Sequence, residues 1–255
     1  MSFHKIKKIF LSFFSVLILF FVVSFIPSNK KKPSKTSVII EFENFVGNEI
    51  LKLDTGNYKN ELEQEYTVSR FKYYIGNIRL KKKNGKDFSS DNYFLVNEEE
   101  PSSKKIILND VPSGVYESID FIIGVDSLHN CSGVQSGALD PLNGMFWAWN
   151  TGYIFMKFEG KSSASKSTGN FLEFHIGGYR NPNNCIRNIT LNLSNNNLIL
   201  SAENAGIIRI KTDVSEIFKS PKTIDFTEYS AITDFHNAVM LTDNYKDMFS
   251  IISVK

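Results

Sequence analysis

The chain of 255 residues has only two cysteines, two tryptophans and four histidines, and it lacks the short motifs that mark common enzymes. No nucleophile elbow, phosphate-binding loop or dinucleotide-binding glycine fingerprint is present. An S-x-x-K string, Ser163 to Lys166, lies in a polar segment without the partner motifs of an acyl-enzyme family. His-x-His and His-Glu-x-x-His spacings are also missing. These absences argue against an enzyme and favour a binding protein.

Excess charge of either sign is also lacking, because the formal net charge is only +2. Residues 1–29 contain three of the lysines. The rest of the chain has 26 Lys and Arg residues and 27 Asp and Glu residues. The short basic run 81–83 is typical of a solvated hairpin end. No basic stripe of the kind that binds nucleic acid remains.

The first 29 residues are typical of an export signal. Lys5, Lys7 and Lys8 precede an apolar run, residues 9–26, that contains only serines as polar residues. The run is close to the roughly 20 apolar residues that span a bilayer as a helix. Neither a small-x-small cleavage site nor a lipobox cysteine is evident, so a cleaved signal peptide and an uncleaved membrane anchor both remain open. We expect the rest of the chain in the periplasm or on the outer face of the cell envelope.

Residues 30–36, rich in Lys, Pro and Ser, are predicted to form a linker, and residues 37–255 one domain. Short β-branched and aromatic segments separated by turn signals predict many strands. The predicted strands cover 38–45, 66–80, 93–96, 105–108, 116–125, 153–158, 171–176, 186–193 and 207–212. The pattern predicts an all-β fold, an antiparallel β-sandwich, with short helices near 213–218 and 231–241 and a bend at Gly76.

Both cysteines, Cys131 and Cys185, lie in the exported part. An oxidising compartment favours a disulfide between them. Closing a loop of that length stabilises by about 4 kcal/mol in the chain-entropy model. Two free thiols are the alternative.

A long segment, residues 124–155, connects two predicted strands and contains both tryptophans, Trp147 and Trp149. Connections of this length in compact domains are usually functional or disordered, and the aromatic content argues against disorder. If the Trp-x-Trp string is extended, both rings lie on one face. The segment is then either an aromatic wall beside a ligand or metal, or a core strand or lid. Asp126 and Asp140 are expected to fix it by accepting backbone hydrogen bonds.

Three histidines outside the signal are candidate metal ligands: His129, His175 and His236. Each alone is more often a structural histidine. If His175 and at least one of His129 and His236 come together beside Trp147 or Trp149, as we expect, their imidazoles would suit a soft or borderline ion such as copper or zinc. Separate hydrogen-bonding roles are the alternative.

The order of several strings resembles the MbnP family, exported β-domain proteins that are associated with copper and named from methanobactin operons. The strings are FENFVGNEILKL (42–53), FKYYIGNIRL (71–80), LNDVPSGVYESIDFIIGVD (108–126), GALDPLNGMFWAWNTGYIFMKFEG (137–160), FHIGG (174–178) and DNYKDMFSI (243–251). They span nearly the whole exported part. The variant is more similar to forms from Bacteroidetes-type bacteria than to the methanotroph forms.

This resemblance implies a β-sandwich that binds one copper ion, as Cu(I), outside the cytoplasm. In relatives, a partner dihaem protein similar to cytochrome c peroxidase (MbnH type) oxidises a tryptophan to kynurenine, which joins histidines around the ion. Carried over, the tryptophan is Trp147 or Trp149 and the FHIGG histidine is His175. His129 lies near the family's loop histidine, with the order of histidine and asparagine reversed. Phe146 stands where relatives often have a histidine.

Two functions from different classes therefore remain open. The first is a copper-binding protein for acquisition or storage, with a dihaem partner and a TonB-dependent receptor as expected neighbours. The second is a metal-free binding or interaction module of the cell envelope with a structural aromatic loop. Copper content, intact mass and gene neighbourhood would discriminate between them.

Overall fold

The computed structural model describes residues 34–147, 149, 152–193 and 197–255. The expected signal or anchor in residues 1–29 and most of the expected linker lie outside the described residues. Within the described part, no helix is both long enough and apolar enough to cross a membrane.

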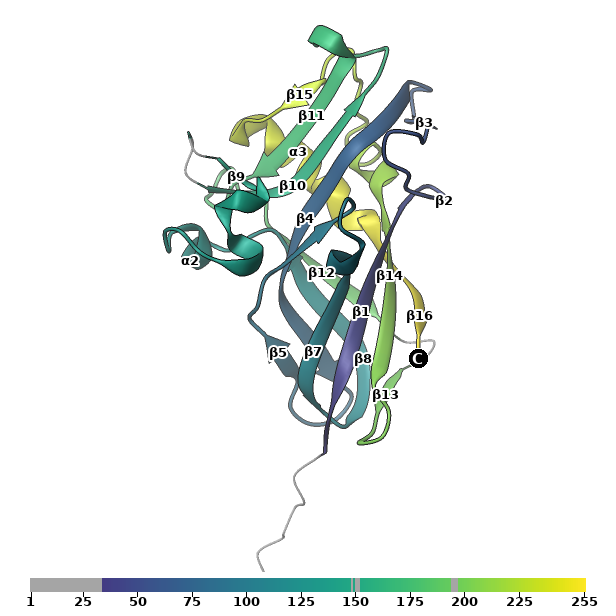
Figure 1. The fold of residues 1–255 in the computed structure, drawn as a ribbon, viewed down its shortest axis with the longest axis vertical. Coiled ribbons are helices and arrows are strands. Elements are labelled where there is room, and N and C mark those ends of the chain that lie inside the picture. Colours follow the sequence, from purple (N-terminus) through teal and green to yellow (C-terminus); the bar gives the residue numbers. More distant parts are fainter. Residues whose placement is uncertain (1–33, 148, 150–151, 194–196) are drawn as a thin grey trace, which may run out of the picture. The chain divides into compact units, whose positions relative to one another are not determined.

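One β-sheet is built around strand β1 (Lys35–Val46), as Figure 1 shows. On one side β1 pairs with β7 (Lys105–Pro112) in antiparallel direction. On the other side it pairs with β14 (Gly206–Asp213) in parallel direction. The remaining strands of this sheet are β2 (Glu49–Ile50) and β16 (Phe249–Val254).

The second sheet is built around the long strand β4 (Glu65–Lys82), in the order β12-β8-β4-β10-β11-β15. The other main strands are β8 (Gly114–Ile123), β10 (Gly152–Lys161), β11 (Phe171–Gly177), β12 (Arg187–Asn192) and β15 (Ala231–Ile232). Short strands that pair with them are β3 (Tyr58–Lys59), β5 (Phe88–Ser90), β6 (Phe94–Asn97), β9 (Phe146–Trp147) and β13 (Leu198–Leu200). A register shift between Gly76 and Arg79 confirms the predicted irregularity of β4.

Aromatic side chains fill the space between the two sheets. The β1 pattern alternates as predicted, and Phe42 points inward with 2% exposure. Its ring contacts Tyr73 of β4 and Phe121 of β8 edge to face, and Phe249 of β16 joins them. Edge-to-face pairs add about 0.5–1.5 kcal/mol each beyond the burial of area. A second aromatic cluster contains Tyr66, Phe158, Phe174, Phe218 and Phe226.

The sandwich prediction is confirmed, with three differences. The β1–β14 and β11–β15 pairs are parallel, so the sheets are mixed. The last strand, β16, was not predicted. The helix expected at 231–241 begins later, because Ala231 and Ile232 pair with β11 as β15.

The helical segments are short and lie at turns or near the chain's end. Helix α3 runs from Phe235 to Tyr245, and Asp234 caps it by accepting hydrogen bonds from two backbone N–H groups. The others are α2 (Ser127–Asn130), η1 (Pro101–Lys104), η2 (Gly137–Leu139), η3 (Pro141–Asn143), η4 (Thr168–Asn170), η5 (Val214–Phe218) and η6 (Lys246–Met248).

Candidate functional site

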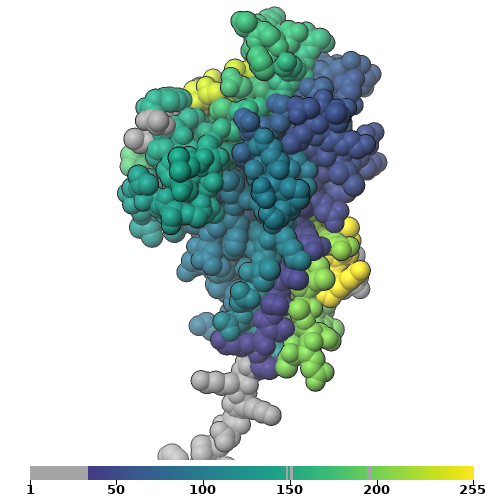
Figure 2. Space-filling view, in the orientation of Figure 1, coloured from purple at the N-terminus to yellow at the C-terminus, as the bar shows by residue number. Residues whose placement is uncertain are grey.

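The described part of the long segment between β8 and β10 folds mainly as a series of tight turns, followed by the two-residue strand β9. Asp126 caps α2 by accepting a hydrogen bond from the backbone N–H of His129, and Asp140 caps η3 by accepting one from Leu142. Gly144 ends η3 with φ +71°, a left-handed conformation that favours glycine. The expected roles of both aspartates are confirmed. The described residues of this segment, 124–147 and 149, form a lobe on the surface that Figure 2 shows in teal.

Three side chains of the second sheet hold this lobe by its backbone carbonyls. The Tyr74 hydroxyl donates to Ala138 O at 2.9 Å, and the Tyr153 hydroxyl donates to Leu139 O at 2.7 Å. Lys157 Nζ donates to Gly144 O at 2.6 Å. The sheet therefore sets the position of the chain just before the two tryptophans.

The two tryptophans have different environments. Trp147 is 4% exposed and packs edge to face on Phe235 of α3, with ring centroids 5.2 Å apart. It lies over Gly177, where a Cβ atom would come within 2.6 Å of the indole ring. Trp149 is 70% exposed, and its ring centroid lies 6.1 Å from that of Trp147. Of the two rings, only Trp147 covers the sheet, so the single aromatic wall that the sequence suggested is half formed.

His175 lies on the same strand as Gly177, two residues away, and its side chain therefore stands on the same face. Its Nε2 donates to Glu159 Oε1 on the neighbouring strand β10 at 2.9 Å. Glu173, two residues before His175, lies opposite Glu159 in the register. One ligand atom from each of Glu159, Glu173 and His175 lies within 4.8 Å of the other two. The structure thus gathers one imidazole and two carboxylates, and Trp147 covers Gly177 on the strand that carries the imidazole.

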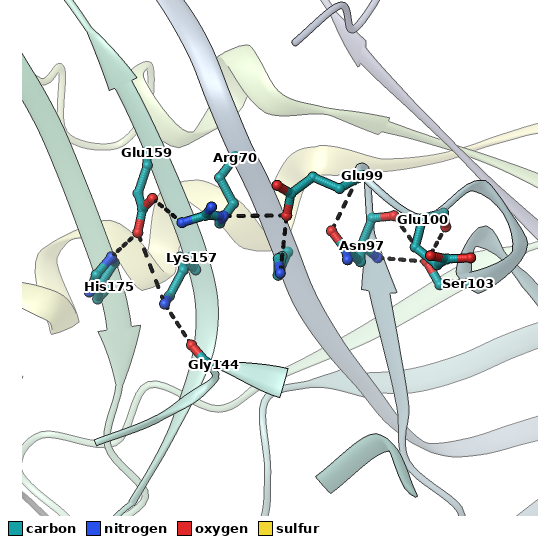
Figure 3. Close-up of polar contacts among 10 residues, drawn as sticks. Arg70, Asn97, Glu99, Glu100, Ser103, Gly144, Lys157, Glu159 and His175 are labelled. Atoms are coloured by element: carbon teal, nitrogen blue, oxygen red, sulfur yellow. Dashed lines mark hydrogen bonds and ion pairs between the residues drawn. The ribbon is translucent and has the colours of Figure 1, made fainter. Parts of the chain in front are cut away.

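Two cations lie close to Glu159, Arg70 on the neighbouring strand β4 and Lys157 on β10 itself, as Figure 3 shows. Arg70 Nη1 lies 2.7 Å from Glu159 Oε2, and Lys157 Nζ lies 4.0 Å from Oε1. The hydrogen bond from His175 lowers the pKa of the Glu159 carboxyl; partial burial opposes this, and Arg70 adds to it. Burial lowers the pKa of the Lys157 ammonium group, and Glu159 opposes this effect. Glu159 is therefore ionised at neutral pH.

The other two candidate histidines lie in other environments. His129 Nδ1 lies 2.9 Å from Asp126 Oδ1, and its ring packs on Tyr93 with centroids 4.6 Å apart. His236 is exposed in the first turn of α3. The sequence predicts that His175 meets at least one of these two histidines. Among the described residues, the structure groups His175 with two carboxylates, and neither His129 nor His236 belongs to that group.

The expected disulfide between Cys131 and Cys185 is also absent, since both are free thiols in the structure. Cys131 is exposed, and its Sγ lies 3.4 Å from the Tyr179 hydroxyl. Cys185 is buried, and its Sγ faces the Asn183 carbonyl. Burial raises the pKa of the Cys185 thiol to about 12, so this group is unreactive at neutral pH.

Glu159 and Glu173 were not among the predicted site residues. The sequence signal that could have identified them is the alternation in Lys157–Glu159 and Glu173–His175. This alternation places polar side chains on one face of two strands. One imidazole with two carboxylates does not match the two or three imidazoles expected for Cu(I). Such oxygen and nitrogen donors suit the harder Cu(II) ion.

The sequence and fold were compared with known proteins. The MbnP family model matches residues 35–239. Among solved structures, MbnP from Methylosinus trichosporium is similar, with a TM-score of 0.53 and 16% identity, over 81% of this chain and 88% of that chain. At that identity the similarity shows a shared fold alone. No curated protein matches the chain.

The family resemblance of the sequence strings therefore agrees with an independent family model and with a shared fold. MbnP proteins are associated with methanobactin operons and with copper, and they are exported in general. The family match covers most of the chain, from the first strand to helix α3. This chain belongs to the MbnP family.

Proposed function

We propose that this protein is an exported copper-binding protein that holds Cu(II) at Glu159, Glu173 and His175. The observation that carries the proposal is the grouping of these three ligand atoms within 4.8 Å of one another. When bound, copper would supply a redox-active centre on this face of the sheet. Glu159 and Glu173 would supply oxygen ligands, and His175 the nitrogen.

The environment of the three residues supports a metal site. They lie on paired strands, so the register fixes their spacing. Trp147 and Phe235 cover the sheet next to His175, which limits the access of water. The copper association of the MbnP family favours copper over other divalent ions, and copper also forms the strongest complexes among divalent first-row metals.

Replacing His175 with alanine is expected to weaken Cu(II) binding by at least about a hundredfold, or about 2.8 kcal/mol. The reason is that the variant loses its nitrogen ligand, and losing even a residue that only orients a ligand costs about ten- to a hundredfold. The measurement is a competition titration of Cu(II) between the full chain and a chelator of known affinity.

The matched controls are His129→Ala and His236→Ala, which remove imidazoles outside the group. Both are expected to bind Cu(II) as the unchanged protein does. If the unchanged protein binds no copper, the metal-free interaction module becomes the better account. If a control variant loses affinity and His175→Ala does not, the ion is held elsewhere.

We also propose that the lobe docks a dihaem protein similar to cytochrome c peroxidase, which would oxidise Trp149 or Trp147. Supporting this, several large apolar side chains of the lobe are exposed: Leu128, Val134, Leu142 and Trp149. Leu142 is 92% exposed, and exposed apolar patches of this kind favour an interface. A TonB-dependent receptor is a further proposed partner.

The docking proposal predicts that Leu142→Asp weakens association with a dihaem protein of the cytochrome c peroxidase type by tenfold or more. A buried charge in an apolar contact is costly, whereas the stability of this exposed position changes by less than about 0.5 kcal/mol. Biosensor titration of the two purified proteins measures the effect. Ile107→Asp, an exposed apolar position on β7, is the control. Equal affinities for both variants would contradict docking on the lobe.

We propose a binding role rather than an enzymatic one. Among the described residues, His129 and His175 form side-chain hydrogen bonds to carboxylates rather than to a hydroxyl or thiol nucleophile. Export to the periplasm or outer face, with residues 9–26 as signal or anchor, is part of the same proposal.

A further inference from the structure

Glu159 is fully engaged before any metal arrives. One carboxylate oxygen accepts from Arg70 at 2.7 Å and the other from His175 at 2.9 Å. Lys157 adds a second cation 4.0 Å away. An ion that uses this carboxylate must therefore share it with a guanidinium, which cannot lose its proton.

We infer that Arg70 competes with the metal for Glu159 and so sets how tightly the site holds copper. This inference rests on the proposed function. Two cations on one carboxylate repel each other, and the repulsion is strong at separations of a few ångströms away from bulk water. Metal binding is therefore coupled to the departure of Arg70 from Glu159.

A second carboxylate can receive Arg70. This carboxylate is Glu99: Arg70 Nε lies 3.3 Å from its Oε2. Lys72 Nζ lies 3.1 Å from the same oxygen. Figure 3 shows Arg70 between Glu159 on one side and Glu99 on the other. Arg70 can shift its contacts toward Glu99 without losing an anionic partner.

This arrangement favours release of the copper ion as well as its binding. When the ion leaves, Arg70 returns from Glu99 and, with Lys157, neutralises Glu159, so this carboxylate is paired in the absence of metal. The site holds copper less tightly than the three ligands would without Arg70. This lower affinity suits a protein that passes its metal on to another molecule.

Two substitutions with opposite expected signs test the inference by competition titration with Cu(II) on the full chain. Arg70→Met removes the competing charge and keeps an unbranched side chain, so affinity is expected to rise about tenfold or more. Glu99→Gln removes the alternative partner of Arg70, so affinity is expected to fall. Arg79→Met, an exposed arginine of the same strand, is the control.

The outcomes separate the inference from the proposed function. If the unchanged protein binds Cu(II) but Arg70→Met binds no tighter, Arg70 is not a competitor and the copper site stands. If neither binds Cu(II), the proposed function fails. If Arg70→Met does not fold by circular dichroism, a fall in affinity for Glu99→Gln supports the inference and an unchanged affinity overturns it.

Discussion

Replacing Trp147 with alanine is expected to lower the free energy of unfolding by about 3–5 kcal/mol, the range typical of a large buried aromatic residue. The indole is 4% exposed and fills the space between Gly177 and Phe235. Its loss leaves a cavity and removes the contact that joins the lobe to helix α3. Urea unfolding followed by circular dichroism measures the change.

Trp149→Ala is the matched control, because it removes the same side chain from an exposed position two residues away. Its expected effect is within about 0.5 kcal/mol. Equal losses for the two variants would mean that Trp147 does not have the structural role that its burial indicates.

Replacing Gly177 with alanine is expected to destabilise the protein by about 1–3 kcal/mol, as overpacking of a tight contact does. A Cβ atom at this position would lie 2.5 Å from the Tyr153 carbonyl oxygen and 2.6 Å from the Trp147 ring. The carbonyl belongs to the backbone of β10 and cannot move away without disturbing the strand. The ring must then shift, so the tryptophan emission is expected to move to longer wavelength.

Gly47→Asn is a suitable control for Gly177→Ala. No atom lies within 4 Å of a Cβ at Gly47, and asparagine tolerates its φ of +61° better than most residues. Its effect is expected to stay below about 1 kcal/mol. If Gly177→Ala is as mild as this control and leaves the emission unchanged, the close packing of Trp147 on the strand is not rigid.

The strands could be predicted because their signal is local. Alternation of apolar and polar residues marks β1, and β-branched and aromatic residues mark β4. The parallel pairing of β1 with β14 could not be predicted, since pairing partners far apart in sequence leave no local pattern. Helical periodicity alone assigned Ala231 and Ile232 to the helix, but in the structure these residues form the short strand β15.

Part of the candidate site could be predicted, because a motif and a strand pattern are local signals too. His175 could be named from its motif, and its place on a strand near Trp147 agrees with that interpretation. Its actual neighbours, Glu159 and Glu173, depend on the register between β10 and β11, which the sequence does not reveal. The number of cysteines and the expected compartment predict the disulfide. Neither gives the positions of the two thiols, which are free in the structure.

The central position of β1 has a consequence for how the protein is made. The first strand of the domain pairs with β14, and Glu41 and Arg209, 168 positions apart, form an ion pair across this junction. Contacts between such distant parts of a chain form slowly. The first sheet cannot close until nearly all of the polypeptide has emerged from the ribosome. If the chain is exported as proposed, this late completion of the core keeps it extended long enough to pass through a translocation channel before it folds.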